Sequence, residues 1–235
     1  MDNRTEQLAD GVWRVEVITY VNTYVLANDG LGDDAGLTVV DTGTASGGPR
    51  LVRSVRMLGL DPRAIRDVLL THWHPDHAGS AARFAASSAG TRVWAGQADL
   101  AVVRGTAPPP APSDATRLGR LGARVLGRRA APAPGARELA ADEVRDVAGG
   151  LRVVASAGHT PGHLAFLLPA RGVLLAGDAL FNVGRLAQPR FMYRSLAEQR
   201  ATVARLAALD YDVLAVGHGP PVTQGAQARV ARLLG

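Results

Sequence analysis

Residues 71–77, Thr-His-Trp-His-Pro-Asp-His, place three imidazoles and a carboxylate directly behind an apolar run at 68–70. Side chains two residues apart on an extended segment point the same way, so His72 and His74 can bind one ion together. Asp76 and His77 face elsewhere and can reach a second position close by. Imidazole and carboxylate groups suit zinc, iron or manganese. Because so many polar groups would stay unpaired without a cation, we interpret the stretch as metal-binding rather than as structural histidines.

Three later apolar runs also stop at a group that can bind metal, and a glycine stands directly before each of these groups. The glycine lets the backbone leave the strand sharply. If the runs are neighbouring strands, their carboxyl ends lie at one edge of a sheet. Five histidines and two aspartates then converge, which suits two metals with an aspartate between them. The pairs are Gly158-His159 after 153–154, Gly177-Asp178 after 173–175, and Gly217-His218 after 213–216.

The elements that must position these groups follow from the hydrophobic pattern. Apolar and polar residues alternate over 12–17, and this run together with 23–27 and 37–40 predicts an opening antiparallel meander. Leu51, Val55 and Leu58 predict a helix after 47–49, and an alanine-rich helix is expected over about 78–86. Two helices are expected near the end of the chain. The first is capped by Ser195 with Glu198, and the second covers 227–234.

Residues 105–150 form the part of the sequence with the weakest pattern, and we interpret them as a mobile insertion rich in proline and arginine. Proline-rich patches stand at 107–112 and 131–135. Between the patches, arginines recur at helical spacing, although glycines weaken the helix. A solvated basic face is favoured over a cap that attracts an anionic substrate. The arginines are Arg117, Arg120, Arg124 and Arg128.

Composition places the chain among ordinary globular proteins, with 47% hydrophobic and 20% charged residues, and its 235 residues fit a single domain. Cysteine is absent, so any metal site consists of His, Asp and Glu. The net charge of +5 comes from arginine alone, without lysine, which is typical of a GC-rich genome and does not indicate nucleic-acid binding. The polar first residues predict no secretory signal, and no apolar run has the length of a membrane span, so we expect a cytoplasmic location.

The metal-binding pattern resembles that of the metallo-β-lactamase-fold hydrolases, glyoxalase II-like enzymes among them, whose signature is H-x-H-x-D-H followed by His, Asp and His on later strands. The resemblance spans nearly the whole chain except 105–150. It implies an α/β fold, the αββα sandwich, and two zinc ions, with iron or manganese as alternatives. It also implies that one metal is bound by His72, His74 and His159, that the other is bound by Asp76, His77 and His218, and that Asp178 bridges them.

Two further residues are expected to support the ligands. Asp41 stands in a Val-Asp-Thr-Gly that looks like the family's, and the resemblance implies that it orients a ligand histidine. A turn-capping role is the alternative for this aspartate. His163, four residues after His159, is expected to be a supporting or structural residue rather than a metal ligand.

The chemistry expected of such a site is hydrolysis of an ester, thioester or lactone of a small acyl compound. A metal-bridging hydroxide attacks the carbonyl, and Asp76 orients the water and passes its proton to the leaving group. The absence of cysteine excludes the lactamases with a cysteine ligand, and His74 stands where flavodiiron-type relatives have glutamate. Two alternatives stay open. One is an iron oxygenase resembling the persulfide dioxygenases, with a single metal at His72, His159 and Asp178, and the other is a nuclease of the same fold.

Specificity is expected to come from side chains around the ligands, with core packing as the rival explanation for each. The expected partner is a small-molecule acyl substrate, and no membrane contact is expected. The sequence does not indicate which oligomeric state the protein adopts. Tyr193 is a displaced counterpart of a tyrosine on which quorum-quenching lactonases depend. The candidates are Trp73, Ile18, Tyr20, Phe181, Asn182, Arg185, Phe191, Met192 and Tyr193.

Overall fold

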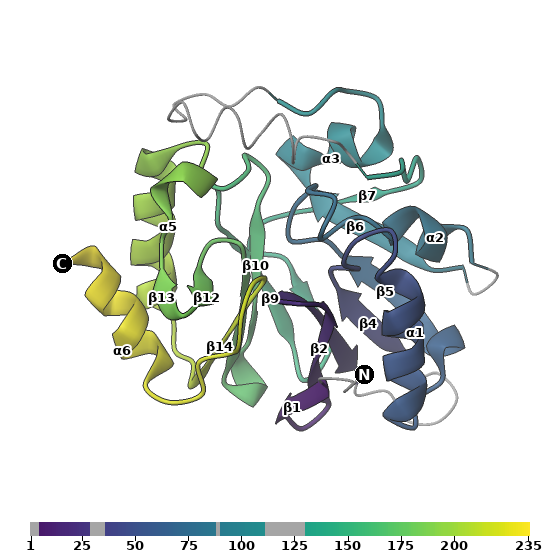
Figure 1. Ribbon diagram of the computed structural model, residues 1–235, viewed down its shortest axis with the longest axis horizontal. Helices are drawn as coiled ribbons and strands as arrows, with labels where there is room; N and C mark the ends of the chain where they lie inside the picture. The colour runs from purple at the N-terminus through teal and green to yellow at the C-terminus, as the bar shows by residue number, and fades with distance from the viewer. Residues whose placement is uncertain (1–4, 29–35, 88–89, 111–129) are drawn as a thin grey trace.

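Two β-sheets pack face to face, and helices cover the outer face of each sheet (Figure 1). The computed structural model describes residues 5–28, 36–87, 90–110 and 130–235. Three apolar clusters separate the layers: one between the first sheet and its helices, one between the sheets, and one between the second sheet and its helices. The predicted αββα sandwich is therefore confirmed.

The first sheet has seven strands, which follow one another in chain order from β1 to β7. The first four are antiparallel, which confirms the predicted meander, and β4 to β7 are parallel. Parallel neighbours need a crossover, and the helices supply it. The strands are β1 Thr5–Ala9, β2 Val12–Ile18, β3 Val21–Ala27, β4 Leu37–Val40, β5 Ile65–Leu69, β6 Arg92–Gly96 and β7 Arg137–Leu139.

The second sheet has five strands in the order β14-β11-β10-β9-β8. Its pairs are antiparallel from β8 to β11, and β14 is parallel to β11. A separate hairpin of β12 and β13 lies beside it. The strands are β8 Val144–Arg145, β9 Leu151–Ala155, β10 Leu164–Leu168, β11 Val173–Gly177, β12 Phe181–Val183, β13 Arg185–Ala187 and β14 Val213–Val216.

The helices divide between the two outer faces. Buried side chains of α1 Gly48–Met57, α2 Ala81–Ala85 and α3 Gln97–Arg104 join the cluster on the first sheet. Those of α5 Leu196–Ala207 and α6 Ala226–Ala231 join the cluster on the second sheet. Short 3₁₀ turns lie at Pro62–Ala64, Pro169–Arg171, Arg190–Met192 and Arg232–Leu234. Within the four described stretches, no helix combines the length and apolarity needed to cross a membrane.

Several elements differ from the expectations. Residues 111–129, which include the four spaced arginines, lie outside the described residues, but 130–150 supply a strand to each sheet, β7 and β8. Such strands of three and two residues are too short for an alternating pattern to reveal them. The sequence analysis also left 87–104 without an element, and β6 and α3 lie there. The alanine-rich helix is only α2, because residues 75–80 form turns and a bend, where Asp76 and His77 lie.

Replacement of Phe166 by alanine tests the packing between the sheets. Phe166 on β10 is fully buried in the central cluster, so we expect the change to lower the free energy of unfolding by about 3–5 kcal/mol. Denaturant unfolding measures the change. Val144→Ala, at a side chain that is 69% exposed, is the control and should change stability by less than about 0.5 kcal/mol. Equal effects of the two substitutions would contradict this account of the core.

Candidate metal centre

The predicted ligands lie on segments that follow the carboxyl ends of four strands. Residues 71–77 follow β5, His159 follows β9, Asp178 follows β11 and His218 follows β14. The strands β9 and β11 are both antiparallel to β10, so they run in the same direction and end at the same edge. The condition that the strands are neighbours is met by β11 and β14, but not by β9 and β11, because β10 lies between β9 and β11.

Backbone hydrogen bonds join the two sheets at this edge. The amide of Leu164, at the start of β10, donates to the carbonyl of Thr71 at 2.8 Å. On the other side of the centre, the amide of Asn22 donates to the carbonyl of Gly217 at 2.9 Å, and Val21 forms an isolated bridge with His218. The ligand segments of both sheets are therefore held against each other by the main chain.

The three glycines before the later ligands serve two purposes. Gly158 and Gly177 have positive φ angles, +139° and +51°, as a sharp exit from a strand requires. Gly217 has no positive φ, so the expected reason does not apply to it. A Cβ atom there would instead overlap Oδ1 of Asp178 and crowd the ring of His77. Gly217 thus provides the space in which these two side chains meet.

The imidazoles of His72, His74 and His159 form the first donor group. Nε2 of His72 lies 2.9 Å from Nδ1 of His74, and Nε2 of His159 lies 2.8 Å from the same nitrogen. These atoms belong to one cluster whose spacing suits a metal ion. His74 and His159 are far apart in the sequence, and the contact between the two sheets brings them together.

Outer hydrogen bonds fix which ring nitrogen carries the proton. Nδ1 of His159 donates to the carbonyl of Met192 at 2.7 Å. The hydroxyl of Thr71 donates to Asp41, so Nδ1 of His72, 3.0 Å away, donates to that hydroxyl. The Nε2 atoms of both rings therefore carry no hydrogen, and their lone pairs face His74. At most one hydrogen therefore lies among three nitrogens, an arrangement that a cation stabilises.

Asp76, His77 and His218 form the second donor group. The Nε2 atoms of the two histidines lie 3.3 Å apart. A carboxylate oxygen of Asp76 lies 3.3 Å from Nε2 of His218 and 3.8 Å from Nε2 of His77. His77 is fully buried, whereas the Asp76 side chain is 31% exposed. This group therefore has an open side toward solvent.

Asp178 lies between the two donor groups. Its Oδ2 atom is 3.4 Å from Nε2 of His159 and 3.3 Å from Nε2 of His218, and its Oδ1 atom is 3.3 Å from Nε2 of His77. The side chain is buried, and Oδ1 accepts no hydrogen bond among the described residues, although the His77 ring lies 3.3 Å away. A carboxylate buried among ligand imidazoles is costly, and a metal cation is the partner that this donor set fits.

Electrostatics differ between the two groups. Burial lowers the pKa of His74 to about 4 and that of His159 to about 3, and it also lowers the pKa of His72, with help from the neighbouring histidines. Burial would lower the pKa of His218 too, but the Asp178 charge outweighs it and raises this pKa to about 9. The pKa of His77 is likewise raised, since Asp178, Asp41 and Asp76 outweigh burial. At neutral pH the first group is thus neutral and the second carries protons.

Asp41 and His163 support the ligands from behind. The buried Asp41 carboxylate accepts hydrogen bonds from Nδ1 of His77 at 2.8 Å and from the amide and hydroxyl of Thr71 at 2.8 and 2.7 Å. Its φ of +58° is rare for a residue other than glycine, a strain that the surrounding contacts must hold in place. Nε2 of His163 accepts from the amide of Asp178 at 3.0 Å, and its Nδ1 lies 2.7 Å from the hydroxyl of Ser156.

Among the predicted substrate-binding residues, two aromatic side chains reach the centre. Phe181 stacks on the ring of His218, with centroids 5.3 Å apart and planes at 12°. Tyr193 lies edge-on to His159 at 6.1 Å, and its hydroxyl donates to the carbonyl of Ala179. Both are buried, so they form an apolar wall of the site.

The other predicted substrate residues lie differently. Ile18 packs against the apolar cluster between the first sheet and its helices, so for this residue core packing is the better explanation. Trp73 belongs to the same cluster. Met192 contributes its backbone carbonyl rather than its side chain. Asn182 and Tyr20 contact the turn after His218: the amide of Asn182 donates to the His218 carbonyl, and the Tyr20 carbonyl accepts from the amide of Gly219. Arg185 and Phe191 are exposed, and no contact with the donor groups is seen among the described residues.

The sequence analysis missed the polar residues that hold these segments. Asn22 is fully buried, and its side chain donates to the carbonyls of Val216 and Gly219 on either side of His218. Asp99 in α3 is also fully buried and bonds to Thr160, next to His159. A polar residue within an apolar pattern, such as Asn22 between Val21 and Tyr24, was the available signal.

Comparisons with known proteins agree with this geometry. The sequence model of the metallo-beta-lactamase superfamily matches residues 18–218. Hydroxyacylglutathione hydrolase GloC of Haemophilus influenzae is 28% identical over 202 residues, 84% of this chain and 86% of that protein. A hydroxyacylglutathione hydrolase of Pseudomonas putida is 35% identical over 179 residues, 73% of this chain, which spans only 52% of that relative.

A solved structure extends the similarity to the whole fold. The metallo-beta-lactamase family protein TTHA1429 of Thermus thermophilus superposes with a TM-score of 0.74 at 29% identity, covering 97% of this chain and 79% of that one. The Rm3 metallo-beta-lactamase superposes with a TM-score of 0.73 at 20% identity, which shows the fold alone. The chain therefore belongs to the metallo-beta-lactamase superfamily and is a metal-dependent hydrolase.

Proposed function

We propose that the chain is a binuclear hydrolase that cleaves the thioester, ester or lactone bond of a small acyl compound, with a thioester as the first choice. The observation that carries this proposal is the Asp178 carboxylate, which faces both donor groups and has a buried oxygen without a hydrogen-bond partner. Two zinc ions are the proposed cofactors, with iron or manganese as alternatives, because all the donors are imidazole or carboxylate.

In this proposal each donor group holds one ion, and Asp178 contacts both. Bound divalent cations lower the pKa of water and stabilise the negative charge that develops on an attacked carbonyl oxygen. The chain's own part is to hold the donors in place before substrate arrives. Hydrogen bonds from His77 to Asp41 and from His159 to the Met192 carbonyl keep the rings oriented, which raises their value as ligands.

Asp76 is the proposed proton carrier. Burial raises its pKa, but the charges of His77 and His218 outweigh that effect, so its pKa is lowered and the carboxylate is ionised at neutral pH. Of the two aspartates among the seven predicted ligands, Asp76 has the more exposed side chain, 31% against 3% for Asp178. A carboxylate in this place can orient a water molecule and pass a proton to the leaving group.

The choice of a thioester rests on the relatives and on one contact. Both relatives described above are hydroxyacylglutathione hydrolases, which suggests a hydroxyacyl thioester as substrate. The Tyr193 hydroxyl, the counterpart proposed for lactonases, donates to the Ala179 carbonyl and so is not free to protonate an alcohol leaving group. A thiolate leaving group depends less on a second acid such as Tyr193, since thiols have a lower pKa than alcohols. A cytoplasmic location stays a prediction.

A panel of substrates tests the reaction class. We expect the zinc-loaded protein to cleave a hydroxyacyl thioester of glutathione faster than a lactone, a simple ester or a phosphodiester of similar size. A faster lactone reaction would overturn the choice of thioester but not the hydrolase. Oxygen consumption with a glutathione persulfide and a single bound iron would support the oxygenase alternative instead.

Replacement of Asp178 by asparagine tests the shared carboxylate. The substitution keeps the shape of the side chain and removes the charge that faces both groups. The rate of hydrolysis should fall by about 100-fold or more, because loss of a residue that only supports a metal ligand already lowers activity by about 10- to 100-fold. Metal content by elemental analysis should fall as well. Asp142→Asn, at a carboxylate that is 77% exposed, is the matched control and should leave both quantities unchanged. Full activity of Asp178→Asn would disprove the role of Asp178.

Proton release on metal binding tests the difference between the groups. A histidine must lose its proton to bind a metal, and at pH 7 only His77 and His218 carry one. Loading the metal-free protein should therefore release about two protons, as measured by calorimetry in buffers of different ionisation enthalpy. Since the pKa of His218 is about 9, the affinity of the second group for its ion should rise between pH 7 and pH 9, as His218 loses its proton.

The His74→Ala variant is the control for this measurement. It lacks a ligand of the first group, whose imidazoles are neutral at pH 7. It should bind one ion and still release about two protons. A variant that binds its ion without proton release would contradict the assignment of the protonated histidines to the second group.

A further inference from the structure

Asp99 is a buried carboxylate that belongs to neither donor group. It lies in the first turn of α3 and is fully buried. Burial raises its pKa to about 6, while hydrogen bonds from Thr160, Gly162 and Trp73 act in the opposite direction. At pH 7 and above the group is ionised and accepts the hydrogen bonds of Thr160 and Gly162. Such a charge is costly to bury unless hydrogen bonds compensate it.

Asp99 holds the loop that carries His159 and lies beside the other ligand segment. The hydroxyl of Thr160 donates to its Oδ2 at 2.6 Å, and the amide of Gly162 donates to its Oδ1 at 2.9 Å. Both donors belong to the loop that carries His159. The backbone amide of Trp73, which stands between His72 and His74, lies close enough to Asp99 to lower the pKa of its carboxyl group. One side chain thus lies between the two segments that supply all three imidazoles of the first donor group.

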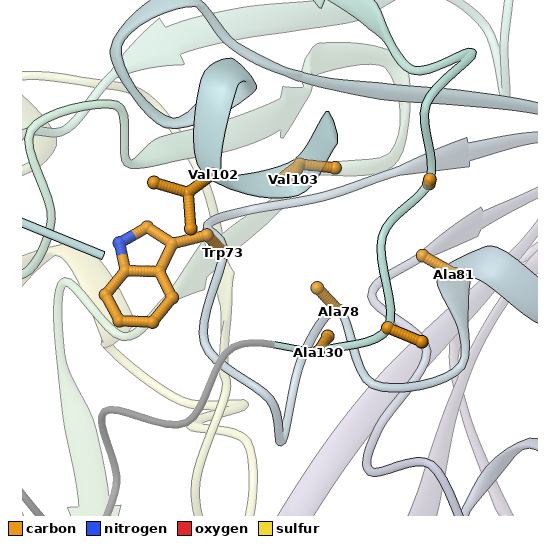
Figure 2. A pocket seen from close by; sticks show the side chains of 8 residues that line it. Trp73, Ala78, Ala81, Val102, Val103 and Ala130 are labelled. Carbon is orange, nitrogen blue, oxygen red and sulfur yellow. The ribbon is translucent and has the colours of Figure 1, made fainter. Parts of the chain in front are cut away.

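Close packing leaves this connection little freedom. A Cβ atom on Gly162 would collide with the backbone and side chain of Asp99, and one on Gly96 would collide with the carbonyl of Gly162. Figure 2 shows the Trp73 indole beside Val102 of α3, in a small apolar pocket that Val103 and Ala78 also line. The helix therefore contacts one ligand segment through Trp73 and the other through Gly162.

We propose that Asp99 is a positioning residue that sets the separation between the His72–His74 segment and His159, and thereby the affinity of the first donor group for its metal ion. The inference rests on the proposed binuclear site. The hydrogen bonds of Asp99 go to Thr160 and Gly162 and not to a ligand side chain, so its effect passes through the backbone of the two segments. Supporting partners of metal ligands typically change metal affinity by about 10- to 100-fold.

Three substitutions test the connection. Asp99→Asn replaces one carboxylate oxygen by an NH₂ group, which cannot accept a hydrogen bond. Either Gly162 or Thr160 therefore loses its acceptor. Thr160→Val removes the donor hydroxyl while keeping a branched side chain, and Thr160→Ser keeps the hydroxyl. We expect Asp99→Asn and Thr160→Val to weaken zinc binding about 10- to 100-fold. Thr160→Ser should bind zinc as tightly as the unchanged protein. Competition with a chelator measures the affinity, and thermal unfolding of each metal-free variant checks that it is folded.

Ligand variants show which ion responds. In a His218→Ala protein, which keeps only the first group complete, Asp99→Asn should weaken binding of the remaining ion by the same factor. In a His74→Ala protein, which keeps only the second group, Asp99→Asn should have no effect. Asn22→Ser is the matched opposite case, because Asn22 holds the His218 turn from β3, and it should weaken only the ion of the second group.

Each result bears on one claim. If the His74→Ala and His218→Ala proteins both bind two zinc ions, the ligand assignment fails, and this inference fails with it. If each binds one ion but Asp99→Asn leaves the His218→Ala protein unchanged, only the inference about Asp99 is overturned. Should Asp99→Asn not fold, Thr160→Val decides the question in the same two backgrounds, and an unchanged affinity there overturns the proposal.

Discussion

Mutual repulsion among buried, unprotonated donors is the constraint on which the rest of the structure depends. In the first group, Nε2 of His72 and Nε2 of His159 lie 2.9 and 2.8 Å from Nδ1 of His74, with at most one hydrogen among the three nitrogens. An oxygen of the Asp178 carboxylate is buried nearby without a hydrogen bond among the described residues. Groups of this kind do not gather in a protein interior unless something compensates them. A pair of cations provides the compensation, and the fold must hold the donors close until the cations bind.

The αββα sandwich provides this restraint at the edge where its two sheets meet. Strands from both sheets end there, and main-chain hydrogen bonds from Leu164 to Thr71 and from Asn22 to Gly217 join the ligand segments. Polar side chains then act from outside the donor groups: Asp41 on His77, Asn22 on the His218 turn and Asp99 on the segment around Thr160. The apolar clusters of the sandwich stabilise the arrangement, since the donors themselves oppose it.

The sequence alone was sufficient for the features that have a short-range pattern. The meander shows strand alternation, and the donors follow apolar runs that become β9, β11 and β14, so the family and the convergence of the seven donors could be predicted. The N-terminal cap of α5 was also predicted: the Ser195 hydroxyl accepts from the amide of Glu198. These features depend on residues that are neighbours in the chain.

What could not be predicted depends on long-range contacts. Asp99 and Thr160 are far apart in sequence, and nothing near Asp99 distinguishes it from an ordinary helix-start aspartate. Met192 acts through its carbonyl, which every residue possesses, and Ile18 turned out to pack in the core. Strands as short as β7 and β8 are defined by their partners rather than by their own residues, which is why the sequence pattern of 130–150 does not distinguish these strands from an insertion.

Anomalous X-ray diffraction from crystals of the zinc-loaded protein tests the central claim most directly. The account predicts two anomalous peaks, one bonded to His72, His74 and His159 and the other to Asp76, His77 and His218, with Asp178 in contact with both. A single peak after full loading, or two peaks with Asp178 bonded to neither, would contradict it.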